Sequence, residues 1–126
     1  MAAGWRAEKH MSEIKTVRQE AIDLSNPEPG LKRQVLAHNK NLMLVRHLMR
    51  KGWHGARHSH PHDQLVYIIK GHLNFIGGDS SFEVKTGDSF VVPGGTQHQA
   101  SALEDSEVLD IFHPWREDYA PVHGLE

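Results

Sequence analysis

Three histidines occupy alternate positions in the stretch HSHPHDQ, which spans residues 58–64. In an extended strand, side chains two residues apart project to the same face, so His58 and His60 point together and Gln64 keeps their parity. Two imidazoles placed in this way supply two ligands to one divalent metal ion. A third imidazole has to come from elsewhere, and His98 follows a tight turn in the stretch PGGTQHQ. The alternative is that these histidines are solvent-exposed or hydrogen-bonded without a metal.

A second candidate group is the carboxylate that interrupts the apolar run VLDIF at residues 108–112. The alternation of a strand places Val108, Asp110 and Phe112 on one face. A buried carboxylate is costly unless it is paired, hydrogen-bonded or near a metal, so an inward Asp110 predicts a general acid or base. Phe112 would then form an apolar wall beside it, or belong to the ordinary core. Asp110 could instead face solvent or a subunit interface.

Arg116 lies beyond this run, after the segment HPW, where it could fold back over the ends of the strands. A guanidinium group binds carboxylates through two parallel hydrogen bonds. Arg116 is therefore a candidate for binding an anionic substrate. Its alternative role is a surface ion pair with Glu117 or Asp118.

Short segments rich in β-branched and aromatic residues must position these groups. We expect strands at residues 42–49, 64–71, 72–78, 81–87, 89–93 and 106–112. Turn signals separate them, at KG, GGDSS, TGD and PGG, while NPEPG at residues 26–30 reads as a loop. Turns spaced about 10 residues apart predict an all-β sandwich or closed barrel.

The chain has 126 residues and a formal net charge of −2, and it contains no cysteine. Its length suits one domain, and its scattered basic residues argue against a nucleic-acid or membrane partner. No apolar run suggests a signal peptide or a membrane span, so we expect a cytoplasmic protein. We divide the chain into an N-terminal extension with the first strand (1–34), a barrel (35–113) and a C-terminal tail (114–126). Residues 1–10 precede MSEIK, which reads like a natural start.

The glycine, proline and histidine spacing resembles the two motifs of the cupin superfamily. The matching residues are Gly52-x5-His58-x-His60-x3-Gln64-x6-Gly71 and then Gly87-x5-Pro93-x-Gly95-x2-His98. The resemblance covers residues 35–113 and implies a double-stranded β-helix, a jelly-roll barrel with a metal inside. Two positions depart from the pattern, because Gln64 replaces the usual glutamate ligand and Ala102 replaces a frequent asparagine.

The departure at position 64 leaves the fourth ligand open. Gln64 could bind through its amide oxygen or only support the metal site, and His62 shares the parity of the ligands, whereas Asp63 points to the opposite face. Three neutral imidazoles and a neutral amide leave the metal charge uncompensated, which favours an anionic ligand. We expect one divalent transition metal, chosen among Zn, Ni, Fe, Mn and Co.

The stretches HSHPHDQ, LVYIIKGHLNF and VLDIFHPWREDY resemble the small single-domain cupins of the KdgF type. Those proteins act late in pectin and alginate breakdown, where they convert 4,5-unsaturated monouronates to linear 5-keto-4-deoxyuronate. The resemblance implies an isomerase-like enzyme that acts on a small anionic sugar, and a homodimer. It assigns the metal to His58, His60, Gln64 and His98, catalysis to Asp110 and Arg116, and substrate contact to Phe112 and Arg116. His113 and Trp115 stand where that family more often has a small residue and a second proline.

Two other functions fit the same barrel. A metal-dependent dioxygenase would use a redox-active ion and would consume oxygen. A non-catalytic sugar-binding or metal-binding module would bind its ligand without turnover, and Asp110 would then be dispensable.

Overall fold

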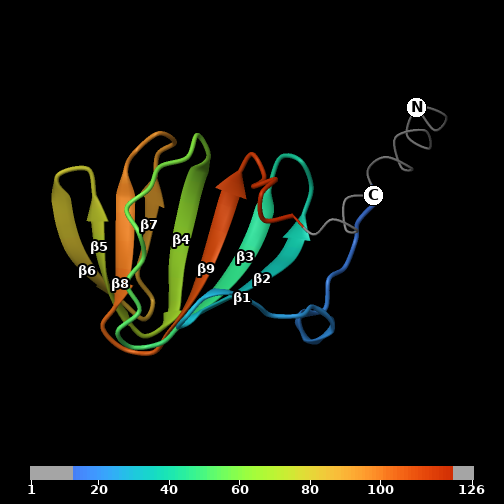
Figure 1. Ribbon diagram of the computed structural model, residues 1–126. Coiled ribbons are helices and arrows are strands. Elements are labelled where there is room, and N and C mark those ends of the chain that lie inside the picture. The colour runs from blue at the N-terminus through green and yellow to red at the C-terminus, as the bar shows by residue number, and fades with distance from the viewer. Residues whose placement is uncertain (1–12, 121–126) are drawn as a thin grey trace.

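The fold consists of two antiparallel β-sheets (Figure 1). It comes from a computed structural model that describes residues 13–120. A short 3-10 helix, η1 (Gln19–Ala21), precedes the sheets. The strands are β1 (Ser25–Glu28), β2 (Leu31–His38), β3 (Met43–Met49), β4 (Asp63–Lys70), β5 (His72–Gly77), β6 (Ser80–Lys85), β7 (Ser89–Val92), β8 (His98–Ala102) and β9 (Ser106–His113). Within residues 13–120 there is no helix with the length and hydropathy needed to span a bilayer.

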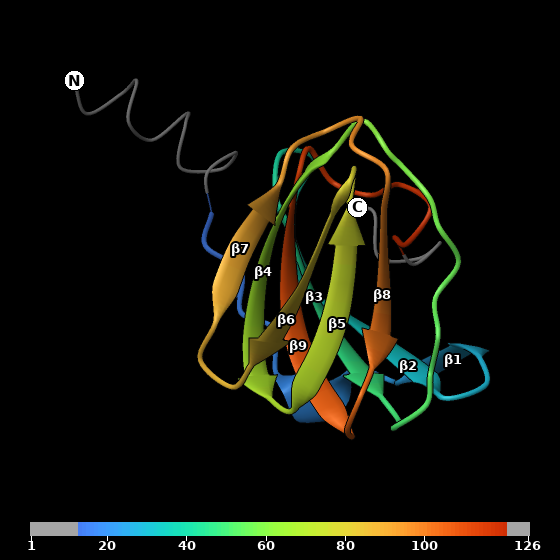
Figure 2. The same ribbon diagram turned by 90° about the vertical axis from the view of Figure 1, so that its left-hand side faces the viewer.

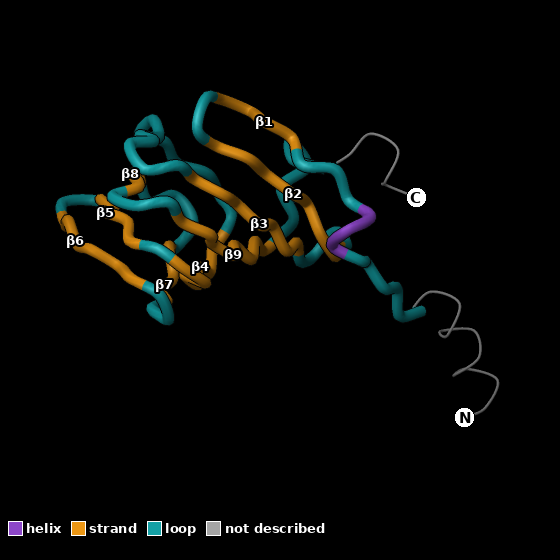
Figure 3. The backbone as a smooth tube through the Cα atoms, turned by 90° about the horizontal axis from the view of Figure 1, so that it is seen from below, coloured by secondary structure: helices purple, strands orange, loops and turns teal. Residues whose placement is uncertain are grey.

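The two sheets enclose the interior of a barrel. The larger sheet has the strand order β1-β2-β3-β9-β4-β7, and the smaller one has the order β6-β5-β8. The smaller sheet lies across the β7, β4 and β9 side of the larger one (Figures 2 and 3). The prediction of an all-β jelly-roll barrel is confirmed.

In the central strands β3 and β9, buried and more exposed side chains alternate, so each strand turns one face toward the interior of the barrel. In β3 every second residue is buried, from Met43 to Met49, and β9 repeats this pattern from Ser106 to Phe112. The two strands pair in antiparallel register, with Val45 opposite Asp110. This register places inward side chains of β3 beside inward side chains of β9, as cross-strand neighbours.

The expected strands agree with β3, β4, β5, β6, β7 and β9 to within two residues at each end. Strands β2 and β8 are not among the expected segments. Residues 26–28 of the expected loop form part of β1, which pairs with β2. The expected boundary between extension and barrel, at residues 34 and 35, lies inside β2. Residues 1–10 fall outside the described part of the chain.

Two apolar clusters form the core, and polar residues lie between them. The larger cluster lies around Ile68 and Val108, and the smaller contains Met43, Val45 and Phe112. Along β9 the inward row runs from Val108 through Asp110 to Phe112, so the carboxylate sits where the two clusters meet. The interior therefore has a polar centre with apolar walls.

Candidate functional site

Three imidazoles meet where the segment before β4 pairs with the start of β8. His58 and His98 exchange two backbone hydrogen bonds, at 3.0 and 2.8 Å. His60 follows two residues later, and its carbonyl oxygen accepts a bond from the N–H of Gly95. The segment approaches the β7–β8 turn so closely that a side chain on Gly94 would collide with the carbonyl oxygen of Pro61. Small residues in this turn are thus needed to bring the histidines together.

The geometry of His58, His60 and His98 suits a metal ion. One ring nitrogen from each lies within 4.8 Å of the others. In every ring Nδ1 faces the carbonyl oxygen of a residue two positions away, at 2.9 to 3.1 Å. A carbonyl only accepts, so Nδ1 carries the proton and the Nε2 lone pair is free to bind a cation. The Nε2 atom of His98 is buried without a hydrogen-bond partner among the described residues.

The protonation of these rings also favours a ligand role. Burial lowers the pKa of His60, and the positive charge of Arg116 lowers it further. Burial likewise lowers the pKa of His98. Both rings are therefore neutral at neutral pH, as a metal ligand must be. His58 is exposed, so the cluster is open to solvent on one side.

Gln64, the second residue of β4, connects this cluster to the carboxylate. Its Nε2 donates to Oδ1 of Asp110 at 2.8 Å, and its Oε1 lies 3.1 Å from Nε2 of His60. Because a carboxylate accepts, the bond to Asp110 fixes the amide orientation and turns Oε1 toward the histidines. Oε1 and the His60 lone pair then face each other, an arrangement that a cation between them would satisfy. The residues present therefore fit a metal with three nitrogen donors and one oxygen donor.

His62, the other candidate for fourth ligand, lies outside this cluster. The chain bends at residues 61 and 62 before β4 begins, which breaks the parity that the sequence suggests. His62 lines a separate surface groove with Trp115 and Asp118. Asp63 points away from the cluster, as expected, and its Oδ1 accepts a bond from the backbone of Gly94.

Asp110 faces the interior and is only 3% exposed. Its Oδ1 accepts from Gln64, and its Oδ2 lies 2.7 Å from Nδ1 of His47. Phe112 is buried on the same face of β9 and makes edge contact with His60, with ring centroids 5.7 Å apart. The sequence prediction of an inward carboxylate beside an apolar wall thus agrees with the geometry.

Arg116 and Tyr119 come from the segment after β9, which folds back against the barrel. Arg116 is buried and binds Asp118 with two hydrogen bonds, at 3.0 and 2.8 Å, so the alternative ion pair is formed. Its guanidinium also lies over the rings of Phe112 and Tyr119, at 5.2 and 4.1 Å from the centroids. Burial raises the pKa of Tyr119. The expected tail thus contributes to the site.

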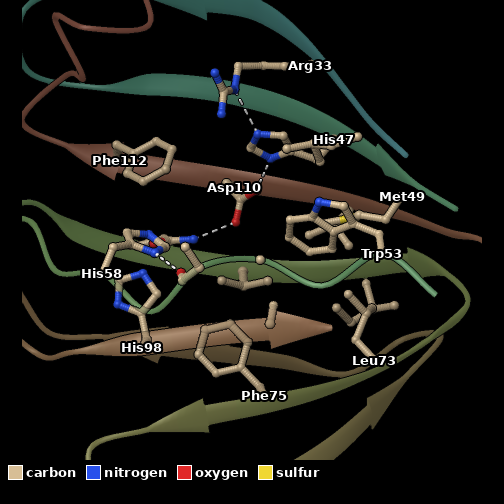
Figure 4. A pocket seen from close by; sticks show the side chains of 18 of the residues that line it. Arg33, His47, Met49, Trp53, His58, Leu73, Phe75, His98, Asp110 and Phe112 are labelled. Carbon is tan, nitrogen blue, oxygen red and sulfur yellow. Dashed lines mark hydrogen bonds and ion pairs between the residues drawn. The ribbon is translucent and has the colours of Figure 1, made fainter. Parts of the chain in front are cut away.

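One cavity of about 290 Å³ is lined by most of these groups, namely His58, Gln64, His98, Asp110, Phe112, Arg116 and Tyr119 (Figure 4). His60 is not a lining residue and lies behind Gln64 and Phe112, which it contacts. His58 and His98 lie toward one end, Met49, Trp53 and Leu73 line the other, and Asp110 lies between them. The cavity therefore has a polar, cation-binding part and an apolar part, as small-molecule sites commonly do.

Among the polar residues that line this cavity, sequence reasoning missed Glu28, Arg33, His47 and Tyr119. His47 shows no spacing pattern with the other histidines. The available signal was the alternation of LMLVRHLM, which puts the side chain at position 47 on the same face as Val45 and Met49. The chain offers no comparable signal for Arg33 or Tyr119, because their placement depends on tertiary packing.

Comparison with known proteins agrees with the fold and with the motifs. The family model described as a cupin domain matches residues 45–112. The pectin degradation protein KdgF of Dickeya dadantii (strain 3937) is 33% identical over 92 residues, which cover 71% of this chain and 84% of that protein.

Two solved structures share the architecture and a third or so of the sequence. KdgF from Halomonas sp. superposes with a TM-score of 0.81 and is 35% identical, covering 85% of this chain and 99% of the other. An RmlC-like cupin from Shewanella frigidimarina also gives a TM-score of 0.81, at 31% identity, covering 86% and 97%.

Proposed function

This chain belongs to the cupin family and resembles its KdgF type, and from that premise we propose that it opens the ring of 4,5-unsaturated monouronates. The product would be the linear 5-keto-4-deoxyuronate formed late in polyuronate breakdown. One observation carries the proposal. Gln64 donates a hydrogen bond to the buried carboxylate of Asp110 and turns its amide oxygen toward a histidine cluster that could hold a metal, and His58, His98, Gln64 and Asp110 line the same cavity.

We assign the metal to His58, His60, His98 and the amide oxygen of Gln64. Gln64 is preferred over His62 because its oxygen faces the cluster, whereas His62 lines another groove. This donor set accepts Zn, Ni, Fe, Mn or Co. When bound, such an ion would supply positive charge that stabilises negative charge developing on the sugar oxygens.

Asp110 is the group proposed to move the proton. Its carboxylate would accept the proton of the C1 hydroxyl while the bond between C1 and the ring oxygen breaks, leaving an aldehyde at C1 and an enolate at C5. Return of that proton to C4 gives the ketone at C5. Atoms and electrons balance without water or an oxidant, so the reaction is an isomerisation. A positioned acid-base group of this kind contributes about 10² to 10⁴ in rate.

Arg116 and Phe112 are proposed to hold the sugar. Asp118 bonds Nε and Nη2 of Arg116, and we assign the C6 carboxylate to the N–H groups for which no further hydrogen bond is found within residues 13–120. Phe112 provides an apolar wall between Arg116 and His60. The uncompensated charge of the metal would add to the attraction for an anionic substrate.

The direct test is turnover of an unsaturated monouronate by the metal-loaded protein. Absorbance of the conjugated double bond should disappear faster than in a protein-free control, with no change in dissolved oxygen. Oxygen uptake at an electrode would identify a dioxygenase instead. Saturable binding without turnover would identify a non-catalytic sugar-binding module.

We also propose that the protein is a homodimer that pairs through the outer face of the larger sheet. Large apolar side chains gather there on neighbouring strands, where Leu65 lies opposite both Val91 and Ile111, and Tyr67 is 47% exposed. A contiguous apolar patch on a sheet face commonly marks an interface. Sedimentation equilibrium should give the dimer mass for the parent and the monomer mass for Val91→Lys. A monomeric parent at micromolar concentration would contradict this assembly.

A further inference from the structure

His47 lies in the centre of β3 and faces the cavity. Its inward neighbours on the strand are Val45 and Met49, both apolar, and its own side chain is nearly buried. A histidine in such a row needs polar partners, because an unsatisfied buried nitrogen is costly. The register supplies two partners: Arg33 lies directly opposite on β2, and Asp110 lies diagonally across on β9.

The hydrogen bonds of His47 have only one consistent direction (Figure 4). Nε of Arg33 lies 3.0 Å from Nε2 of the ring. A guanidinium group only donates, so Nε2 of His47 must accept. The ring proton is therefore on Nδ1, which donates to Oδ2 of Asp110 at 2.7 Å. This arrangement selects the neutral ring in a single tautomer.

Arg33 is itself held in place. Its guanidinium carbon lies 3.7 Å from the centroid of the Tyr119 ring, which is close stacking. Among residues 13–120, no carboxylate forms an ion pair with Arg33. Arg33 thus directs its Nε–H at His47 rather than at an acidic partner. Tyr119 holds Arg33 in place on one side of this hydrogen bond, and Asp110 holds His47 on the other.

Asp110 consequently accepts one bond on each carboxylate oxygen, from Gln64 on Oδ1 and from His47 on Oδ2. Two donors from opposite sides prevent rotation of the carboxylate about its Cβ–Cγ bond. Each oxygen retains a lone pair for a further partner, because a carboxylate has about four acceptor sites.

We propose that His47 is a positioning residue that orients Asp110 for proton transfer, with Arg33 setting the tautomer of His47. The inference rests on the proposed function, in which Asp110 carries the proton. Loss of the bond from His47 would leave the carboxylate held from one side only. Misplacement of a reacting group by about 1 Å can reduce a rate about 10²-fold.

Two substitutions separate this role from simple packing. The side-chain nitrogen of asparagine is two bonds from Cβ, as is Nδ1 of histidine, so His47→Asn keeps the donor to Asp110. The amide of glutamine is one bond longer and matches Nε2, so His47→Gln keeps the acceptor for Arg33 and loses that donor. Both variants remove the ring and leave a cavity. His54→Gln is the matched control, because His54 is exposed and bonds only to Gln99 in the described chain.

We expect His47→Gln to lower kcat about 10- to 100-fold with KM within about twofold and metal content unchanged. His47→Asn should recover most of that loss, and His54→Gln should behave as the parent. Equal losses in both His47 variants, or a parental kcat in His47→Gln, would overturn the proposal.

A measurement that needs no catalytic turnover tests the hydrogen-bond geometry of His47 independently of the proposed reaction. If the metal-loaded parent converts no monouronate, the proposed function fails. Nitrogen NMR of the metal-free protein still shows whether Arg33 and Asp110 hold His47 in the tautomer described above. The His47 resonances should show the proton on Nδ1, and Arg33→Met should redistribute it between the two ring nitrogens. A proton on Nε2 in the parent, or a spectrum unaffected by Arg33→Met, would refute the positioning role.

Discussion

Replacement of Gln64 by glutamate tests how the histidine cluster and the carboxylate are coupled. Nε2 of Gln64 donates to Oδ1 of Asp110 at 2.8 Å, so Gln64→Glu puts a carboxylate where a donor stood. Two unit charges about 4 Å apart repel by about 4 kcal/mol at an effective dielectric constant of about 20. Proton uptake by the pair would relieve part of this repulsion.

We therefore expect Gln64→Glu to destabilise the metal-free protein by about 2 to 4 kcal/mol. For a chain of this size the melting temperature should fall by about 10 °C. Bound metal should reverse much of the loss, because its positive charge would offset the negative charge introduced at position 64. Gln97→Glu is the matched control, since it adds the same charge at an exposed glutamine that bonds Arg57.

The double variant Gln64→Glu with Asp110→Asn gives the decisive comparison. The amide nitrogen introduced at position 110 would donate to the carboxylate introduced at position 64, and the amide oxygen at position 110 would accept from His47. Every polar atom of the pair would again have a partner. Calorimetry of the four proteins without metal should show a favourable coupling of at least about 2 kcal/mol. Effects that add to within about 0.5 kcal/mol would show that the two side chains are independent.

Metal binding, pH dependence and substrate affinity each give a further prediction. His58→Ala combined with His60→Ala should abolish bound metal in elemental analysis of protein purified without a metal-affinity column, and parental metal content would place the site elsewhere. Burial lowers the pKa of His60 and His98 below the ordinary 6.5, so below that pH the unfolded chain binds more protons than the fold. The melting temperature of the metal-free protein should therefore fall as pH drops below about 6.5, and a flat profile between about pH 8 and 5.5 would contradict this. Arg116→Lys keeps the charge but loses the planar fork, so KM for the uronate should rise about tenfold with a smaller change in kcat, and an unchanged KM would remove Arg116 from substrate binding.

From the sequence alone, local periodicity predicted which side chains share a face of a strand. Alternation in VLDIF put Asp110 and Phe112 on one face without deciding whether that face is inward, and the burial of both residues shows that it is. The same rule failed at His62, because it assumes a regular strand and the chain bends at residues 61 and 62. Gln64 faces the same interior as His60, whereas His62 leaves the group of metal-ligand candidates and packs its ring edge-on against His60 and Phe112.

The rest of the site depends on contacts between distant segments. The positioning role proposed for His47 depends on the register of β3 against β2 and β9, because this register places Arg33 on one side of the ring and Asp110 on the other. Tyr119 lies in a segment without strand periodicity, and in the cavity the guanidinium groups of Arg33 and Arg116 lie over its ring. Neither arrangement leaves a pattern in a single sequence.

The most direct test of the account is proton NMR of an unsaturated monouronate during incubation with metal-loaded parent and with Asp110→Asn. The parent should convert the olefinic signal at C4 to that of the linear keto product, well above the protein-free rate. Asp110→Asn, with equal metal content, should be slower by about 10² or more. Equal rates for the two proteins, or a parental rate no higher than the protein-free control, would contradict the account.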